Sequence, residues 1–153
     1  MGYFVRGGSA GSADEARGVN RVMLSSKSPH YATPKGLYAE LDAEFGFDLD
    51  PCPFNPDYSG PLFSYDGLNV SWEGRRVYCN PPYGKAIPRF MAKAHEADVA
   101  VFLIPARTDT KWFHEVALPQ AKEIRFLKGR LKFENAKDPA PFPCMLVIFR
   151  KAA

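Results

Sequence analysis

Apolar positions recur at helical spacing near the start of the regular part of the chain. Between residues 35 and 45 they fall on one face of a helix, and they are Leu37, Tyr38, Leu41 and Phe45. Thr33 and Pro34 predict the start of this helix, with Thr33 as its N-cap and proline in the first helical position. Gly46 predicts its end, because glycine readily adopts the left-handed conformation that closes many helices.

Further apolar runs alternate between strand and helix patterns. The unbroken run 99–104 predicts a strand that is buried on both faces, as in parallel sheets. Shorter strands are predicted at 47–50 and 76–79, helices at about 87–96 and 111–118, and a final pair of strands at 123–133 and 144–150. This order predicts an α/β fold with helices on both faces of a mostly parallel sheet of five or six strands, the last two antiparallel.

The ends of the chain suggest a simple domain organisation. Residues 1–28 are rich in glycine and serine without any sustained period, which predicts a flexible N-terminal arm. Residues 29–153 then form a single domain of ordinary size. No run of 18 apolar residues occurs, and the first residues lack the apolar centre of a signal peptide. We therefore expect a cytoplasmic protein.

Charge and cysteine content add two constraints. The net charge of +3 is compatible with a polyanionic partner, although many unrelated domains carry as much. Basic residues gather in one short stretch, as Lys122, Arg125, Lys128, Arg130 and Lys132, which also suits a solvated strand face. The three cysteines are odd in number and include no CxxC pair, which argues against a disulfide framework and a zinc site. We expect no metal.

Three of the predicted strands end in the same way, with an apolar run followed by polar residues and proline. The three ends are Asp48-Leu49-Asp50-Pro51, Cys79-Asn80-Pro81-Pro82-Tyr83 and Ile104-Pro105-Ala106-Arg107. In an open α/β sheet, ligands bind beyond the carboxyl ends of the strands. We therefore expect Asp50, Asn80 and Pro105 to lie at one edge of the sheet and to face one cleft.

The Asn80–Tyr83 segment carries the most specific chemistry. The lone pair of an adenine N6 amine is delocalised into the ring, so the amine is a poor nucleophile. The Asn80 side chain and the Pro81 carbonyl can accept hydrogen bonds from the amine, while Pro81 and Pro82 hold the direction of the backbone. Tyr83 offers a ring on which a base taken out of the duplex can stack. The segment predicts methylation of an exocyclic amine.

Several readings of this segment remain open. Any planar conjugated amine suits the same groups, so cytosine N4 and adenine in RNA are alternatives to adenine N6 in DNA. A DNA-binding module of the same fold without activity is an alternative of another class. Pro51-Cys52 and Pro143-Cys144 also match the Pro-Cys pair of cytosine-C5 methyltransferases, but that chemistry needs a thiolate at the strand end that Asn80 already occupies.

The chain resembles the small phage-type DNA N6-adenine methyltransferases from about Ser26 to Phe149. The resemblance rests on the segments 31–35, 45–52, 66–68, 77–84, 104–114 and 129–133. It implies a compact, trimmed class I methyltransferase (Rossmann-like) fold with S-adenosylmethionine as methyl donor. It places Thr33, Pro34, Asp50, Pro51 and Cys52 at the methionine end of that cofactor, with Asp48 in the same segment, and Asp66 near the adenine moiety.

The resemblance also implies double-stranded DNA as the partner, with the target adenine flipped out of the helix. Arg107 and Lys111 follow the third strand end and suit phosphate contacts. Arg130, Lys132 and Trp112 complete the predicted DNA contacts, although Trp112 also suits a core position. Two features depart from the family. Pro51–Asn55 replaces the usual glycine-rich turn, and only about thirty residues separate Asp50 from Asn80. The sheet should therefore be trimmed, without a separate target-recognition domain.

Overall fold

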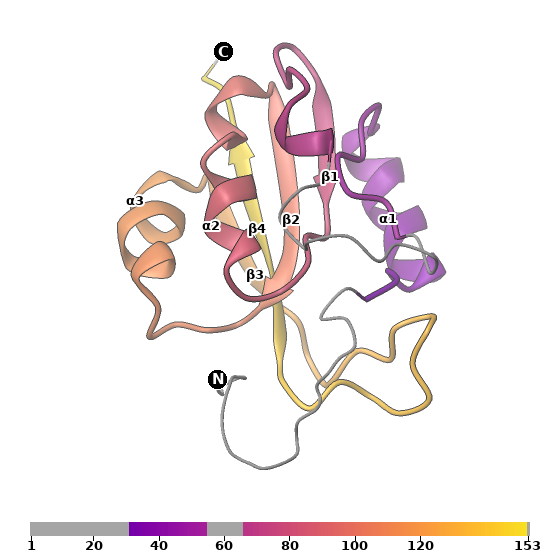
Figure 1. Cartoon of the computed structure of the whole chain (residues 1–153). Helices are drawn as coiled ribbons and strands as arrows, with labels where there is room; N and C mark the ends of the chain where they lie inside the picture. The colour runs from indigo at the N-terminus through magenta and orange to yellow at the C-terminus, as the bar shows by residue number, and fades with distance from the viewer. Residues whose placement is uncertain (1–30, 55–65, 153) are drawn as a thin grey trace.

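The computed structural model describes residues 31–54 and 66–152, and its centre is a four-stranded mixed sheet in the order β1-β2-β4-β3. The strands are β1 (Arg76–Cys79), β2 (Val99–Pro105), β3 (Glu123–Phe126) and β4 (Cys144–Arg150). β1 pairs with β2 in parallel, whereas β4 is antiparallel to both of its neighbours, β2 and β3. Figure 1 shows β4 running against β2 in the middle of the sheet.

The α/β class and the antiparallel pairing of the last two strands are confirmed, but the expectation of a mostly parallel sheet is wrong. Among the described residues only one of the three neighbouring strand pairs is parallel. The reason lies in the burial of the last two strands. β4 is buried along six of its seven residues and takes a central place, between β2 and β3. β3 is half exposed and takes the edge.

Two predicted strands are shorter than expected. The segment around Leu49 forms a single parallel bridge to Val77 and no regular strand, since Pro51 lacks the N–H that would continue the pairing. The strand predicted at 123–133 ends at Phe126, and the chain from 127 to 143 becomes a long loop. In the part of the chain that the structure describes, the sheet therefore has four strands and not the five or six that we expected.

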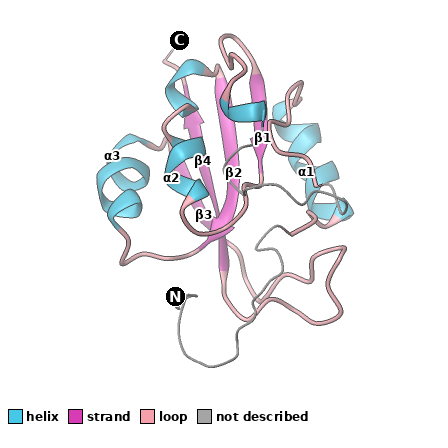
Figure 2. Ribbon diagram, viewed as in Figure 1, coloured by secondary structure: helices cyan, strands magenta, loops and turns pink. Residues whose placement is uncertain are grey.

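Helices cover both faces of the sheet, as predicted (Figure 2). α1 (Lys35–Phe45) ends as predicted and begins one residue later than predicted, and Gly46 closes it at φ 63° with its N–H on the carbonyl of Asp42. The predicted helix at 87–96 divides into α2 (Ala86–Met91) and the 3-10 helix η2 (Ala94–Glu96). The predicted helix at 111–118 is a π-helix, η3 (Phe113–Ala117), that continues into α3 (Leu118–Gln120). A further 3-10 helix, η1, spans Asp66–Leu68.

The expected N-cap of α1 is wrong. Pro34 occupies the cap position and makes no side-chain cap bond. The carboxylate of Glu134 instead accepts a hydrogen bond from the backbone N–H of Lys35 at 2.9 Å. The hydroxyl of Thr33 lies 2.6 Å from the phenol oxygen of Tyr78 and so points away from the helix. A residue about one hundred positions away therefore caps the helix, and Thr33 is available for another contact.

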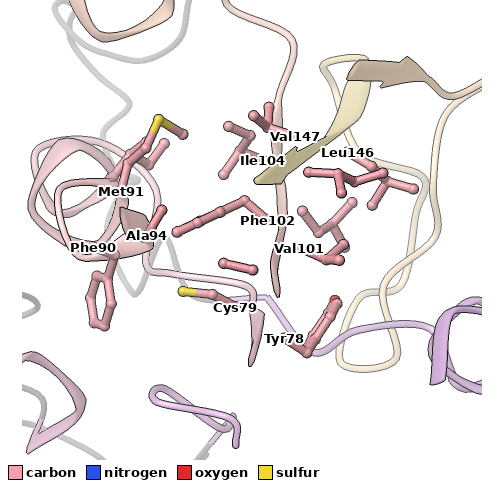
Figure 3. Packing of buried hydrophobic residues seen from close by; sticks show 14 of the residues in the cluster. Tyr78, Cys79, Phe90, Met91, Ala94, Val101, Phe102, Ile104, Leu146 and Val147 are labelled. Atoms are coloured by element: carbon pink, nitrogen blue, oxygen red, sulfur yellow. The ribbon is translucent and has the colours of Figure 1, made fainter. Parts of the chain in front are cut away.

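The core forms where alternate side chains of the strands meet the helices. β2 is buried along its whole length, as its unbroken apolar sequence predicted. Figure 3 shows Cys79 and Phe102 pointing toward Phe90 and Ala94, while Tyr78 and Val101 point to the opposite face. On that opposite face the ring of Tyr78 contacts Tyr38 of α1, with ring centroids 5.0 Å apart.

No helix in the described part of the chain is long and apolar enough to cross a membrane. The flexible arm expected at 1–28 lies outside the described residues, as does most of the loop between Cys52 and η1.

Candidate functional site

The carboxyl ends of the parallel segments meet at one edge of the sheet, as the sequence predicted. Leu49 bridges Val77 in parallel and accepts a hydrogen bond from the N–H of Tyr78 at 3.0 Å. Asp50 and Asn80 therefore leave adjacent chain segments in the same direction. Because β1 is parallel to β2, Pro105 lies at this edge as well. We call this end of the sheet, the lower one in Figure 1, the carboxyl edge.

A cavity of about 370 Å³ opens at the carboxyl edge. Its walls come from the start of α1, the ends of two parallel segments and the β3–β4 loop. The lining residues are Tyr31, Ala32, Thr33, Lys35, Tyr38, Asp50, Cys52, Phe54, Tyr78, Asn80 and Glu134. The structure thus brings four residues that we predicted from sequence, Thr33, Asp50, Cys52 and Asn80, into one pocket.

Asn80 is the buried polar residue of this site, with 4% of its surface exposed. Its Nδ2 donates to the carbonyl of Tyr31 at 2.5 Å and to Oγ1 of Thr33 at 3.1 Å. A carbonyl oxygen can only accept, so the amide NH2 must face Tyr31. The opposite atom, Oδ1, is buried and has no hydrogen-bond partner among the described residues. Asn80 therefore offers an unsatisfied acceptor.

Tyr83 follows Asn80 after two buried prolines and is itself only 8% exposed. Its ring packs against that of Tyr31, with centroids 5.3 Å apart and planes tilted by 33°. Phe142 approaches the ring edge-on at 5.6 Å. The hydroxyl of Tyr83 donates to the carbonyl of Leu103 at 3.4 Å, which is a long hydrogen bond. In this structure the ring of Tyr31 thus packs against the ring on which we expected a base to stack.

Asp50 faces the pocket, and its Oδ1 accepts a hydrogen bond from the N–H of Cys52 at 3.1 Å. Asp50 keeps an exposed surface at the pocket, and the protein packed around its carboxyl desolvates it in part, which raises its pKa to about 6. A carboxylate held in such a place favours a cationic ligand, because a nearby positive charge would restore its ionised form.

Asp48 lies two residues earlier in the chain, and the structure does not bring it to the pocket. Its Oδ1 accepts hydrogen bonds from the N–H of Arg76 at 2.8 Å and from Nε of Arg75 at 3.2 Å. These contacts hold the pKa of the Asp48 carboxyl below its ordinary value. The two aspartates differ in their position along the segment: Asp48 lies beside Arg75 and Arg76 at the start of β1, whereas Asp50 lies further on, at the wall of the pocket.

The other expected cofactor residues lie around the pocket or beside it. Pro34 caps α1 and Pro51 is buried next to η1. A Cβ on Gly67 would lie 1.8 Å from the carbonyl oxygen of Pro51, so only glycine fits there. This close approach places η1, which begins at Asp66, against the Pro51-Cys52 turn. The side chain of Asp66 lies outside what the structure describes.

The cysteines near the site are buried thiols. Cys52 and Cys79 have their sulfur atoms 3.7 Å apart, and Cys52 donates to the carbonyl of Asn80 at 3.4 Å. Burial raises the pKa of Cys144 to about 12 and that of Cys79 well above its ordinary value. Thiols of this kind are not nucleophiles at neutral pH. The Pro143-Cys144 pair is therefore poorly suited to cytosine-C5 chemistry.

The sequence reasoning missed the contribution of the β3–β4 loop. The segment 31–34, which we call the strap, is tied to this loop at Glu134 and Asn135. The N–H of Ala32 donates to Oδ1 of Asn135, and the N–H of Glu134 donates to the carbonyl of Ala32, both at 2.9 Å. The sequence offered one signal for this contribution, because Glu134 directly follows the 129–133 segment that carries part of the resemblance. The contact between Glu134 and the strap could not be predicted, because about one hundred residues separate them.

The predicted DNA contacts lie on the same side as the pocket but are not all alike. Lys111 is exposed, and Trp112 is half-buried and packs against the core. Arg130 and Lys132 are exposed on the β3–β4 loop, where they donate to the carbonyls of Ala140 and Ala136. Arg107 follows β2 and is half-buried.

The ion pairs of the fold lie elsewhere. Those between described residues join Arg75 to Asp48, Lys93 to Glu96, and Arg125 to both Glu44 and Glu123, all at the opposite end of the sheet. None of them involves Lys111, Lys128, Arg130 or Lys132. Lys111 and Lys128 are exposed, whereas Arg130 and Lys132 donate hydrogen bonds to carbonyl oxygens of their own loop.

These features define an α/β protein with a ligand pocket at the carboxyl ends of its parallel segments. Asn80, one of the lining residues, carries a buried acceptor without a partner among the described residues. Sequence comparison supplies the family. Residues 22–152 match the family described as DNA N-6-adenine-methyltransferase (Dam), and the chain belongs to that family. A DNA N-6-adenine-methyltransferase of Haemophilus phage HP1 is 32% identical over 139 residues, with 80% of this chain and 79% of the relative covered. No solved structure matches the chain.

Proposed function

We propose that this protein methylates the N6 amine of adenine in DNA, with S-adenosylmethionine as the methyl donor. The observation that carries the proposal is the buried Oδ1 of Asn80, which has no partner among residues 31–54 and 66–152 and belongs to a residue that lines a ligand pocket, in a chain of the Dam family. A buried acceptor without a partner costs about 1–3 kcal/mol, so it is retained where a ligand satisfies it. An amine that carries hydrogens is such a ligand.

The pocket fits the proposed cofactor in size and chemistry. Its volume of about 370 Å³ lies within the usual range for small-molecule sites. Asp50 would hold the amino group of the methionine end, and the rings of Tyr38 and Tyr78 supply apolar walls whose faces attract cations. Thr33 and Cys52 line the same end. When bound, the cofactor supplies a methyl group that is already activated on a sulfonium.

Asn80 and Pro81 would bind the target amine. Oδ1 of Asn80 and the carbonyl of Pro81 accept its hydrogens, which localises the nitrogen lone pair as the methyl group arrives. N6 then gains the methyl group and loses a proton to solvent. Groups held in advance in this way act mainly on the transition state and therefore raise the rate of the chemical step.

Tyr83 would stack on the flipped base, in a class I methyltransferase arrangement of the kind that the sequence suggested. The ring of Tyr31 already packs on Tyr83, so a base that stacks there takes the place of this ring. Extrusion of a base costs a few kcal/mol, which such stacking offsets in part. The ring of Tyr31 would move aside while its backbone remains tied to the β3–β4 loop.

Double-stranded DNA would bind across the carboxyl edge. Lys111 and Lys128 are exposed there and form no ion pair with another described residue. Arg107, Arg130, Lys132 and Trp112 complete this surface as we propose it. Phosphate contacts of this kind position the duplex but do not read its sequence. A place in the cytoplasm of a bacterial or phage-infected cell would give the enzyme its substrate.

A methyl-transfer assay tests the proposal directly. The protein is incubated with labelled S-adenosylmethionine and unmethylated genomic DNA, and in parallel with RNA, and the nucleosides are then analysed. N6-methyladenine in DNA is the expected product. N4-methylcytosine, or label in RNA alone, would move the activity to one of the alternative amines. No transfer by a protein that binds DNA would favour the silent DNA-binding module.

A further inference from the structure

The orientation of the Asn80 amide decides whether this residue can serve the proposed reaction. An amide presents a carbonyl oxygen at one end and an NH2 group at the other, and the two ends have almost the same shape. Only the oxygen can accept a hydrogen from the target amine. Rotation of the amide by half a turn would present NH2 groups to each other and remove the interaction. A site of this kind therefore needs something that fixes the amide.

Two groups of the strap contact the NH2 end of Asn80. The carbonyl of Tyr31 accepts from Nδ2 at 2.5 Å, and Oγ1 of Thr33 accepts from the same nitrogen at 3.1 Å. The NH2 group thus has two hydrogens and two acceptors within hydrogen-bond distance. In the rotated amide, Oδ1 would face the Tyr31 carbonyl oxygen, and two acceptors would be in repulsive contact.

Thr33 is itself held in place. Its Oγ1 lies 2.6 Å from the phenol oxygen of Tyr78, which is almost fully buried in β1. Burial raises the pKa of the Tyr78 phenol well above its ordinary value, so the phenol keeps its proton and can donate it to Thr33. A continuous chain of hydrogen bonds thus runs from Tyr78 through Thr33 to Asn80.

The strap backbone is also fixed independently of the Tyr31 ring. Ala32 exchanges hydrogen bonds with Asn135 and Glu134, and Glu134 also accepts from the N–H of Lys35. The Tyr31 ring can therefore leave Tyr83 without loss of the Tyr31 carbonyl. These anchors come from the β3–β4 loop and from β1, so they do not depend on a bound ligand.

We propose that Thr33, held by Tyr78, is a positioning residue that fixes the Asn80 amide with its oxygen toward the target amine. This inference rests on the proposed function of Asn80 and adds a role for Thr33 beyond lining the cofactor pocket. Thr33 itself touches neither the amine nor the methyl group. Its hydroxyl acts by keeping the acceptor end of Asn80 in the site before the base arrives.

The test compares Thr33→Val, which removes the hydroxyl and keeps the shape, with Thr33→Ser, which restores the hydroxyl. Single-turnover rates are measured on unmethylated genomic DNA at saturating S-adenosylmethionine, so that a change in cofactor affinity does not enter the rate. Cofactor affinity is measured separately by calorimetry. We expect Thr33→Val to lower the rate by about two- to tenfold, the usual effect of one hydrogen bond, and Thr33→Ser to restore it.

A second readout needs no activity. In the DNA-free protein, hydrogen exchange of the Asn80 side-chain NH2, followed by NMR, should be slow in the wild type and in Thr33→Ser. It should be faster in Thr33→Val, because one of its two acceptors is lost. Tyr78→Phe should show a smaller change in the same direction in the single-turnover rate and in the hydrogen exchange. If Thr33→Val does not fold, Tyr78→Phe takes its place in the test.

The outcomes separate this inference from the proposed function. If the wild type makes no N6-methyladenine in DNA, the proposed function fails, while the NMR measurement still decides how the amide is held. If the wild type is active but folded Thr33→Val, or Tyr78→Phe in its place, keeps wild-type rate and exchange, the positioning role is overturned. The positioning role is also overturned if Thr33→Val is slower than the wild type only below saturation with S-adenosylmethionine, because Thr33 would then act on cofactor binding alone.

Discussion

The two ends of the central sheet differ in how their polar groups are satisfied. At the end where β1 and β2 begin, charged groups are paired: Asp48 with Arg75, and Arg125 with Glu44 and Glu123. At the carboxyl edge, Oδ1 of Asn80 is buried without a partner in the described part of the chain, and desolvation raises the pKa of Asp50. The paired charges at the first end stabilise the folded chain, whereas the polar groups at the carboxyl edge are the ones that we propose bind ligands.

This difference shows how one short segment can serve both purposes. Asp48 and Asp50 are two residues apart and chemically identical, yet the pKa of one carboxyl is lowered and that of the other is raised. Arginine side chains and a backbone N–H surround the first, while the second sits at the wall of a cavity. The position of a carboxyl relative to its neighbours therefore decides its role.

The largest effect should come from Asn80→Ala. Removal of one preorganised polar contact to the reacting group costs about a hundred- to a thousandfold in turnover, by analogy with a lost oxyanion-hole donor. Cofactor affinity should change little. Single-turnover experiments measure the rate, and calorimetry measures the affinity for S-adenosylmethionine. Asn69→Ala, the same change at an exposed turn, is the control. Wild-type single-turnover rates in Asn80→Ala would remove the chief support for the adenine N6 assignment.

The two aspartates provide a matched pair for cofactor binding. Asp50→Ala should weaken S-adenosylmethionine binding by about ten- to a hundredfold, because a charge-assisted hydrogen bond is lost. Asp48→Ala should leave the affinity unchanged and lower the free energy of unfolding by less than about 1 kcal/mol, as for exposed ion pairs. Calorimetry and chemical denaturation give the two values. If Asp50→Ala and Asp48→Ala lost the same amount of cofactor affinity, the two ends of the sheet would not differ in ligand binding as we propose.

The raised pKa of Asp50 also predicts a pH dependence. The carboxyl binds a cation only when ionised, so affinity should be full above its pKa and decline as pH falls through about 6. We expect binding at about pH 5 to be roughly tenfold weaker than at about pH 7.5. Asp50→Asn should bind weakly at both values and lose this dependence. A wild-type affinity that is flat over this range would show that Asp50 does not pair with the cofactor.

A smaller effect is expected from the cations of the carboxyl edge. Replacement of Lys111 and Lys128 by glutamine should make the salt dependence of DNA binding shallower by up to about 0.9 per lost phosphate contact. The control is the same double change at Lys122 and Lys151, which are exposed at the opposite end. Titrations at several salt concentrations measure the slopes. Equal slopes for the two double variants would show that DNA does not bind across the carboxyl edge.

The smallest effect should be that of Tyr83→Phe. Among the described residues, the hydroxyl of Tyr83 makes one long hydrogen bond, to Leu103. The ring, which phenylalanine retains, does the packing and the proposed stacking. We expect a single-turnover rate within about twofold of the wild type, since a weak hydrogen bond contributes at the low end of the usual range. A tenfold loss in a stably folded variant would assign the hydroxyl a direct part in the reaction.

Local patterns in the sequence determined the α/β class, the bounds of α1 and β1, and the shared edge of Asp50, Asn80 and Pro105. These features depend on neighbours in the chain: apolar spacing, proline after a strand, and glycine after a helix. Asn80 could be singled out because its chemistry is carried by four consecutive residues. The family resemblance added the cofactor and the target amine on the same local segments.

Only the tertiary structure decided the strand order, the cap of α1 and the direction of the Asn80 amide. Each of these depends on contacts between residues far apart in sequence, such as Glu134 with Lys35 or Tyr31 with Asn80. The sequence showed that 123–133 and 144–150 were strand-like, but not that the more buried one would take the centre. Burial is a property of the assembled core. The pKa values of the two aspartates depend on tertiary contacts as well, because the surrounding chain desolvates Asp50 while the backbone N–H of Arg76 and the side chain of Arg75 stabilise the charge of Asp48.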